Sequence, residues 1–234
     1  LELIKYRYSY STVDVEKLFE DQTLSNVKFR LKSLKINTNH SKNFRKFLAL
    51  HKDTLEHLEM PKIDDETSKL LNKFTKLSSL GMNKISENFT KTENIRTIKT
   101  EDKIHERWPK QFPFVKSVEC FNYDNLKEFP YLETLYVKWP IIMDASLFPL
   151  TVKNLTINNY SRGEHPKHPL PFSGHQIEVL QVQAGKCPLW LIEFIEKTET
   201  RLKFLRLRTM CRTDEEHFFK FRQAVIKNRE KIEK

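Results

Sequence analysis

The residues LETLYV at positions 132–137 and VKNLTI at positions 152–157 share one pattern, and this pattern decides the fold. In both stretches apolar residues occupy the first, fourth and sixth places, and variable residues occupy the other places. The last four places therefore alternate between apolar and variable, which is the period of a β-strand with one buried face.

The same pattern recurs through residues 31–207, at intervals of 17 to 25 residues. The other copies are LKSLKI at 31–36, LEHLEM at 55–60, LSSLGM at 77–82, IRTIKT at 95–100, VKSVEC at 115–120, IEVLQV at 177–182 and LKFLRL at 202–207. A random chain of this length and composition would contain roughly three or four copies of this pattern. An ordered series at near-regular spacing therefore indicates an internal repeat.

Segments with helical spacing lie between several of these strands. Phe44, Phe47 and Leu48 would share one helical face, and a second stripe consists of Trp190, Leu191, Phe194 and Ile195. A single strand and helix cannot hide their apolar faces, so neighbouring units must stack. The sequence predicts an α/β solenoid, or horseshoe, with parallel strands on the concave side and helices and irregular turns on the convex side. The shortest intervals predict 3₁₀ or extended connections in place of full helices.

The repeat pattern and its flanking segments predict one continuous domain with three parts. Residues 1–30 form an N-terminal flank with a truncated first repeat and a short helix, and residues 31–212 form the repeats. Residues 213–234 form a C-terminal capping helix with a basic tail, and we expect Phe218, Phe221 and Val225 on its apolar face. We also expect one buried line of leucines across the strands, formed by Leu58, Leu80, Leu135, Leu155, Leu180 and Leu205.

Composition limits the classes of protein that this chain can be. It has 234 residues, of which 38% are hydrophobic, and this fraction supports a real core. No apolar run approaches the roughly 18 residues that a membrane span requires, so no membrane association is expected. Three cysteines are too few for a disulfide framework. They favour a reducing intracellular compartment, either the cytoplasm or the nucleus.

Motifs of enzymes are not found in the sequence. It has no GxxxxGK[ST], GxGxxG or HExxH motif, so we expect no catalytic residue, no cofactor and no metal. His165 and His168 in GEHPKHP, together with Cys187, could be part of a metal site. Because four ligands with defined spacing are not visible, we favour a proline-stiffened surface loop.

A binding surface follows from the strand alternation. If the apolar places point into the core, the variable places form the concave face, which is the extended surface that solenoids offer to partners. Aromatic and arginine side chains are the usual hot spots of protein interfaces, so Phe121, Tyr136, Phe204, Arg206 and Arg208 are the chosen anchors. The full set of partner-binding candidates is Lys35, His57, Glu59, Lys99, Glu119, Phe121, Tyr136, Lys138, Gln181, Phe204, Arg206 and Arg208.

The net charge of +10 raises nucleic acid as an alternative partner. The concave face itself has five Lys or Arg residues (35, 99, 138, 206 and 208) and three Glu residues (59, 101 and 119), a surplus of two. Because phosphate binding needs a contiguous basic stripe, this small surplus argues against nucleic acid and favours a protein target.

The whole pattern resembles a leucine-rich repeat domain. The phrasing of residues 44–60, FRKFLALHKDTLEHLEM, is similar to the repeats of F-box-type, ribonuclease-inhibitor-like proteins, the substrate receptors of SCF ubiquitin ligases. The resemblance implies a non-catalytic protein–protein interaction module that recognises substrates for ubiquitin-dependent degradation. It also implies an F-box upstream of this chain that binds the ligase adaptor. A generic leucine-rich repeat scaffold and a basic nucleic-acid-binding surface remain the alternatives.

Overall fold

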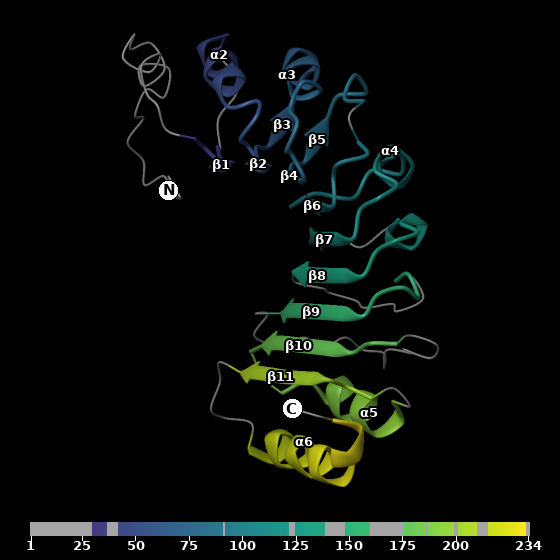
Figure 1. Ribbon diagram of the computed structural model, residues 1–234. Coiled ribbons are helices and arrows are strands. Elements are labelled where there is room, and N and C mark those ends of the chain that lie inside the picture. The colour runs from purple at the N-terminus through teal and green to yellow at the C-terminus, as the bar shows by residue number, and fades with distance from the viewer. Residues whose placement is uncertain are drawn as a thin grey trace. The chain divides into compact units, whose positions relative to one another are not determined.

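The computed structural model describes residues 30–36, 42–90, 92–121, 125–138, 148–159, 176–185, 187–198, 201–209 and 215–232 (Figure 1). The chain divides into two compact units, a first unit of residues 1–100 and a second unit of residues 101–234. The N-terminal flank expected before residue 30, with its short helix, lies outside the described residues.

Parallel β-strands are the main element of both units, which confirms the predicted α/β class with a parallel sheet. In the nine-strand order of this sheet, the first unit supplies β1 (Ser33–Lys35), β2 (His57–Glu59), β4 (Ser79–Gly81) and β6 (Thr97–Lys99). The second unit supplies β7 (Ser117–Cys120), β8 (Thr134–Lys138), β9 (Asn154–Asn159), β10 (Val179–Ala184) and β11 (Phe204–Thr209).

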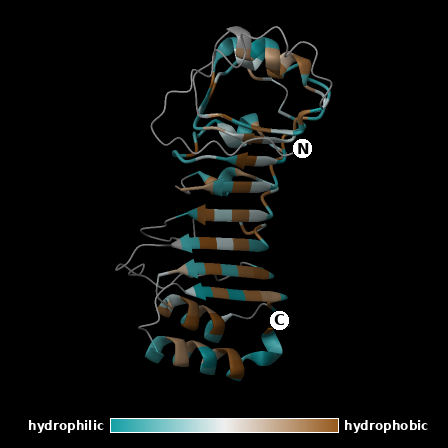
Figure 2. Cartoon of the chain, turned by 90° about the vertical axis from the view of Figure 1, so that its left-hand side faces the viewer, coloured by the Kyte–Doolittle hydropathy of each residue, from teal (hydrophilic) through white to brown (hydrophobic). Residues whose placement is uncertain are grey.

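The strand register aligns equivalent places of the repeat. The fourth place forms one line in the first unit, Leu34, Leu58, Leu80 and Ile98. In the second unit the corresponding line is Val118, Leu135, Leu155, Leu180 and Leu205. Apolar and polar residues alternate visibly along the strands (Figure 2), because successive side chains point to opposite faces.

The expected burial of these leucines holds for all but one of them. Leu58, Leu80, Leu135, Leu155 and Leu180 are almost completely buried. Leu205 is only half-buried, and so is Leu34 at the other end of the strand order. Both residues lie on an outermost strand of the described order, which has a neighbouring strand on one side only among the described residues, and this position explains the difference.

Helices and short turns connect the strands. The first unit has α2 (Lys42–Leu50) and α3 (Asp65–Leu71), together with a two-stranded parallel sheet of β3 (Lys62–Ile63) and β5 (Lys84–Ile85). The second unit has α4 (Trp108–Gln111), the 3₁₀ helix η2 (Leu126–Glu128), α5 (Leu189–Lys197), α6 (Glu215–Lys227) and the 3₁₀ helix η4 (Arg229–Lys231).

The predicted helical stripes are confirmed. On α2, Phe44 and Leu48 are buried one turn apart, and Phe47 beside them is half-buried. On α5 the four predicted residues, Trp190, Leu191, Phe194 and Ile195, are all buried. Apolar side chains at helical spacing therefore anchor both helices to the cores of their own units.

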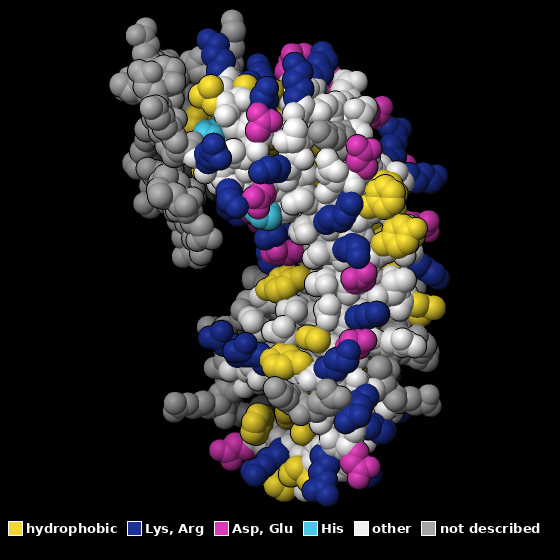
Figure 3. Space-filling view, viewed as in Figure 1, with side chains coloured by type: hydrophobic (Ala, Val, Ile, Leu, Met, Phe, Trp, Pro, Cys, Tyr) yellow, Lys and Arg dark blue, Asp and Glu magenta, His cyan; other side chains and the backbone are white. Residues whose placement is uncertain are grey.

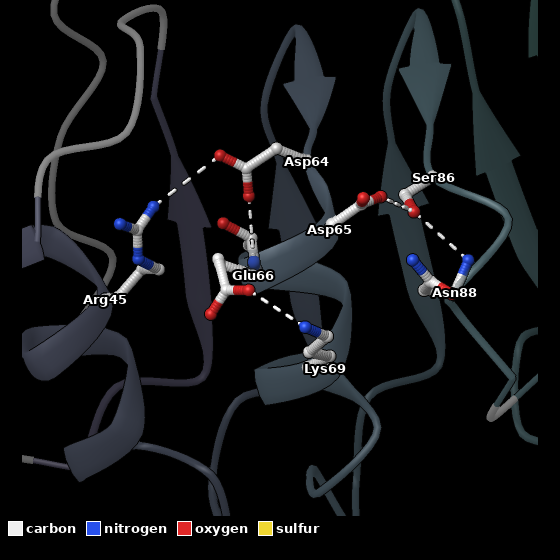
Figure 4. A network of polar contacts seen from close by, with 8 residues as sticks. Arg45, Asp64, Asp65, Glu66, Lys69, Ser86 and Asn88 are labelled. Atoms are coloured by element: carbon white, nitrogen blue, oxygen red, sulfur yellow. Dashed lines mark hydrogen bonds and ion pairs between the residues drawn. The ribbon is translucent and has the colours of Figure 1, made fainter.

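Polar contacts hold the start of α3 against its neighbours in the first unit (Figure 4). The carboxylate of Asp64 caps the helix by accepting a 2.8 Å hydrogen bond from the backbone N–H of Thr67, and the guanidinium of Arg45 lies 3.5 Å from its other oxygen. The hydroxyl of Ser86, next to β5, donates to Asp65. Exposed ion pairs contribute little to stability, so the cap is the main stabilising element of this network.

A 3₁₀ helix replaces an α-helix in the shortest repeat interval, between the strands that follow residues 115 and 132. Asn125 at its start has a left-handed backbone (φ 65°), and its side-chain amide donates a 3.0 Å hydrogen bond to the carbonyl of Ile104. Leu126 and Phe129 are buried on either side of this turn. The expectation of a 3₁₀ connection is confirmed here.

The C-terminal helix α6 packs against α5. Its buried residue is Ala224, whereas Phe221 and Val225 are half-buried and Phe218 is 51% exposed. The predicted apolar face was thus wrong for Phe218, because the buried side of the helix is centred on Ala224. The chain after α6 returns to the sheet, where the backbone N–H of Leu202 donates a 2.7 Å hydrogen bond to the carbonyl of Lys231.

Candidate protein-binding face

The variable places of the repeat share one face of the sheet in each unit, and we call it the polar face. In the second unit the strand register arranges these side chains in rows. The first row is Ser117, Thr134, Asn154, Val179 and Phe204, and the second is Glu119, Tyr136, Thr156, Gln181 and Arg206. The third contains Lys138, Asn158, Gln183 and Arg208, with Phe121 directly after β7.

All of the predicted site residues of the second unit therefore lie on its polar face. They are Glu119, Phe121, Tyr136, Lys138, Gln181, Phe204, Arg206 and Arg208. None of the first six is fully buried, and the two arginines are exposed. The structure thus brings these eight residues together from segments up to 89 positions apart in the sequence (208 minus 119).

The remaining predicted site residues lie on the polar face of the first unit. Lys35, Glu59, Gly81 and Lys99 form one row, and His57 lies in the neighbouring row. Lys35 and Glu59 form an ion pair across β1 and β2. The Glu59 side chain also leans over Gly81, because a Cβ atom at Gly81 would lie only 2.4 Å from the Glu59 Cγ.

Lys138 is the centre of a compact cluster on the second unit. Its ammonium forms an ion pair with Glu119 and lies 5.4 Å from the centre of the Phe121 ring and 5.6 Å from that of Tyr136. Both distances allow a cation–π attraction. The charged side chains of this pair are only 28% (Lys138) and 25% (Glu119) exposed. Two aromatic rings therefore shield a charge pair from solvent.

Electrostatics keep Lys138 charged in this setting. Partial burial by itself lowers its pKa, but the hydrogen bond and the negative charge of Glu119 outweigh burial, so the pKa of Lys138 is raised above its ordinary 10.5. Beneath the face, burial raises the pKa of the Cys120 thiol to about 12. Cys120 is consequently a protonated core residue at neutral pH and is not a nucleophile.

Two asparagines connect β9 to β8 through their side chains. The amide of Asn158 donates a 2.9 Å hydrogen bond to the hydroxyl of Tyr136, and the amide of Asn154 donates a 3.2 Å hydrogen bond to the hydroxyl of Thr134. Asn158 is only 7% exposed, and its Oδ1 atom has no hydrogen-bond partner among the described residues. Asn158 is not among the partner-binding candidates from the sequence, although the strand alternation itself assigns it to this face.

The β10–β11 side of the polar face has unpaired positive charges among the described residues, unlike the side around Lys138. Arg206 and Arg208 are exposed, and neither forms a hydrogen bond or an ion pair with a described residue. Gln181 lies beside Arg206 in the register and Gln183 beside Arg208. Positive charge on this side is thus free, whereas the positive charge of Lys138 is already neutralised by Glu119.

The metal alternative gains no support within the described residues. There, no group of three or more His, Cys, Asp or Glu side chains is placed to hold a metal ion. Cys187 is buried, and the loop with His165 and His168 lies outside the described residues. Among the helices that the structure describes, none has both the length and the apolar character needed to cross a membrane.

The exposed surface mixes charges of both signs. Lys and Arg side chains are interspersed with Asp and Glu side chains over the visible face (Figure 3). Several of them form cross-strand ion pairs, such as Lys116 with Glu133 at 3.1 Å and Lys203 with Glu178 at 2.7 Å. Several basic side chains are thus paired locally, while the net charge of the chain remains +10.

Comparison of the chain with protein families, with curated proteins and with solved structures finds no match.

Proposed function

We propose that this chain is a leucine-rich-repeat-type solenoid that binds another protein on its polar face, without catalysis of its own. One observation carries this proposal: three aromatic residues and two free arginines share the five-strand polar face of the second unit. Aromatic and arginine side chains dominate the binding energy of protein interfaces. A specific complex on this face would bury at least about 1,000 Å² in total.

The repeat architecture is supported by the regular phase of the strands. Each strand of the nine-strand order begins at the third place of its pattern, and the described pairs of these strands are parallel and in register. A parallel sheet built from one strand per repeat is the arrangement that stacked repeats use to share a continuous core. This arrangement leaves one face of each strand free for a partner.

The resemblance of residues 44–60 to F-box-type repeats supports a specific cellular role for this binding module. The chain is the substrate-recognition domain of an F-box subunit of an SCF-type ubiquitin ligase, working in the cytoplasm or nucleus. An F-box upstream binds the ligase adaptor, and the polar face holds the target protein. Ubiquitin transfer belongs to other subunits, so this chain needs no cofactor and no metal.

Partner capture from cells tests both parts of the proposal. The full open reading frame, tagged and purified, should co-purify with a ligase adaptor and with target proteins. Tyr136→Ala combined with Arg206→Glu should release the targets and leave the adaptor bound. Because Tyr136 is half-buried and accepts a hydrogen bond from Asn158, this variant should also lose at least about 1–2 kcal/mol of its free energy of unfolding, and circular dichroism should show that it remains folded.

The matched control is Tyr131→Ala combined with Arg222→Glu, which changes an exposed tyrosine and an exposed arginine away from the polar face. Loss of the targets from the control variant but not from the test variant would remove the polar face from the proposal. An adaptor that never co-purifies would remove the ubiquitin-ligase role. Salt-sensitive binding of a mixed-sequence oligonucleotide near physiological ionic strength would favour the nucleic-acid alternative.

A further inference from the structure

Two arginines without a described ionic partner lie two residues apart on β11, the last strand in the order of the sheet. Arg206 and Arg208 both project from the polar face of β11 and are exposed. Their register neighbours on β10 and β9 are uncharged: Gln181 and Thr156 for Arg206, and Gln183 and Asn158 for Arg208. The carboxylate of Glu178, directly before β10, is paired with Lys203 at 2.7 Å. Among the described residues, no carboxylate compensates the arginine pair.

The spacing of the pair matches an extended peptide. Residues two apart on a strand point to the same face and lie about 6.5–7 Å apart. Side chains two apart in an extended partner segment have the same spacing. A carboxylate opposite each guanidinium can accept two parallel hydrogen bonds, which is the geometry that arginine recognises best.

We propose that the partner of this face presents an extended acidic segment, whose Asp or Glu side chains at alternate positions pair with Arg206 and Arg208. This inference rests on the proposed function and adds the chemistry of the target. The glutamine row on β10 supplies neutral amides beside the arginines, whereas the aromatic cluster around Lys138 accepts an uncharged part of the partner. The polar face thus selects by charge at β11 and by shape at β7 and β8.

The charge distribution favours an acidic protein segment over nucleic acid. A phosphate backbone needs positive charges that continue along its path. Here the row of Arg208 continues into Gln183 and Asn158 and ends at Lys138, whose charge is held by Glu119. Two adjacent free charges fit a short acidic stretch of a protein.

Selection from a library of random dodecapeptides displayed on phage tests the inference on the immobilised full chain. Selected peptides should be enriched in Asp and Glu, most strongly at positions two apart. Their synthetic versions should bind R206E/R208E at least about tenfold more weakly than the wild type, because two attractions become repulsions. They should bind R222E/K227E, which makes the same change of charge on exposed residues of α6, within about twofold of the wild type.

Each other outcome counts against the inference. Peptides that lose binding with Tyr136→Ala, but show no acidic enrichment and bind R206E/R208E normally, would overturn the inference and leave the proposed function standing. Peptides that ignore every polar-face variant would overturn both. A mixed-sequence oligonucleotide that binds through the two arginines, while no acidic peptide is selected, would assign the pair to phosphate. If R206E/R208E fails to fold, R206Q/R208Q provides the same comparison with about tenfold weakening still expected.

Discussion

The side-chain amide of Asn158 on β9 lies 2.9 Å from the hydroxyl oxygen of Tyr136 on β8, in the middle of the polar face. The two residues are 22 positions apart in the sequence. Their hydrogen bond fixes the tyrosine ring, which in turn borders the ammonium of Lys138. A buried amide thus positions the aromatic residue that we propose as a binding anchor.

Tyr136→Phe should destabilise the protein by about 1–2 kcal/mol, because it leaves the buried amide of Asn158 without its described partner. Urea unfolding followed by circular dichroism measures this change. In an Asn158→Ala background the same substitution should cost less than about 0.5 kcal/mol, since no amide remains to be left unpaired. Equal costs in the two backgrounds would show that the hydrogen bond does not stabilise the fold.

The strands and the polar face can both be predicted from the sequence, because both follow from the alternation of apolar and variable residues along each strand. The apolar places of LETLYV and VKNLTI specify which side chains are buried, and the repetition of the pattern sets the register between strands. Any residue in a variable place, such as Arg206, can therefore be assigned to the polar face before a structure exists.

Other features depend on contacts between side chains, which a period cannot specify. The shielding of Lys138 by Phe121 and Tyr136 arises from the rotamers of residues on two strands. On α6 apolar residues lie on more than one face of the helix, and the structure buries the face that contains Ala224. The half-burial of Leu205 depends on its strand being last in the order.

Glu119→Gln should show how Lys138 contributes to stability as the pH changes. Because the folded-state pKa of Lys138 is raised above 10.5, its contribution is fully present below the unfolded pKa and is lost as the pH rises through the folded pKa. The stability difference between the wild type and Glu119→Gln should therefore be constant from about pH 8 to 10 and shrink above that range. Urea unfolding at a series of pH values measures it.

The matched control for this experiment is Glu133→Gln, which removes the exposed partner of Lys116. Exposed pairs contribute about 0–1 kcal/mol, so the control should change the free energy of unfolding little at any pH. A wild-type advantage over Glu119→Gln that persists undiminished at pH 12 would contradict the assignment of this stability to the charge of Lys138.

Gly81→Ala should destabilise the first unit by about 1–3 kcal/mol, the usual cost of placing an extra carbon where no space exists. The new Cβ atom would lie 2.4 Å from the Glu59 Cγ and 3.2 Å from the Glu59 Cα, so both the side chain and the strand must shift. Combination with Glu59→Ala removes the closest contact and should restore about half of the lost stability. Thermal unfolding of the three variants measures this, and an unchanged melting temperature for Gly81→Ala would show that Glu59 moves away freely.

Leu155→Ala and Leu205→Ala delete the same atoms from one line of the sheet and differ only in their place along it. Leu155 lies between Leu135 and Leu180 and is completely buried, so its deletion leaves a cavity and should cost about 2–5 kcal/mol. Leu205 is half-buried on the outermost strand, where the gap is open on one side, and its deletion should cost about half as much. Guanidinium unfolding gives both values. Equal losses would contradict the half-burial of Leu205 and would mean that the core side of β11 is covered as fully as that of β9.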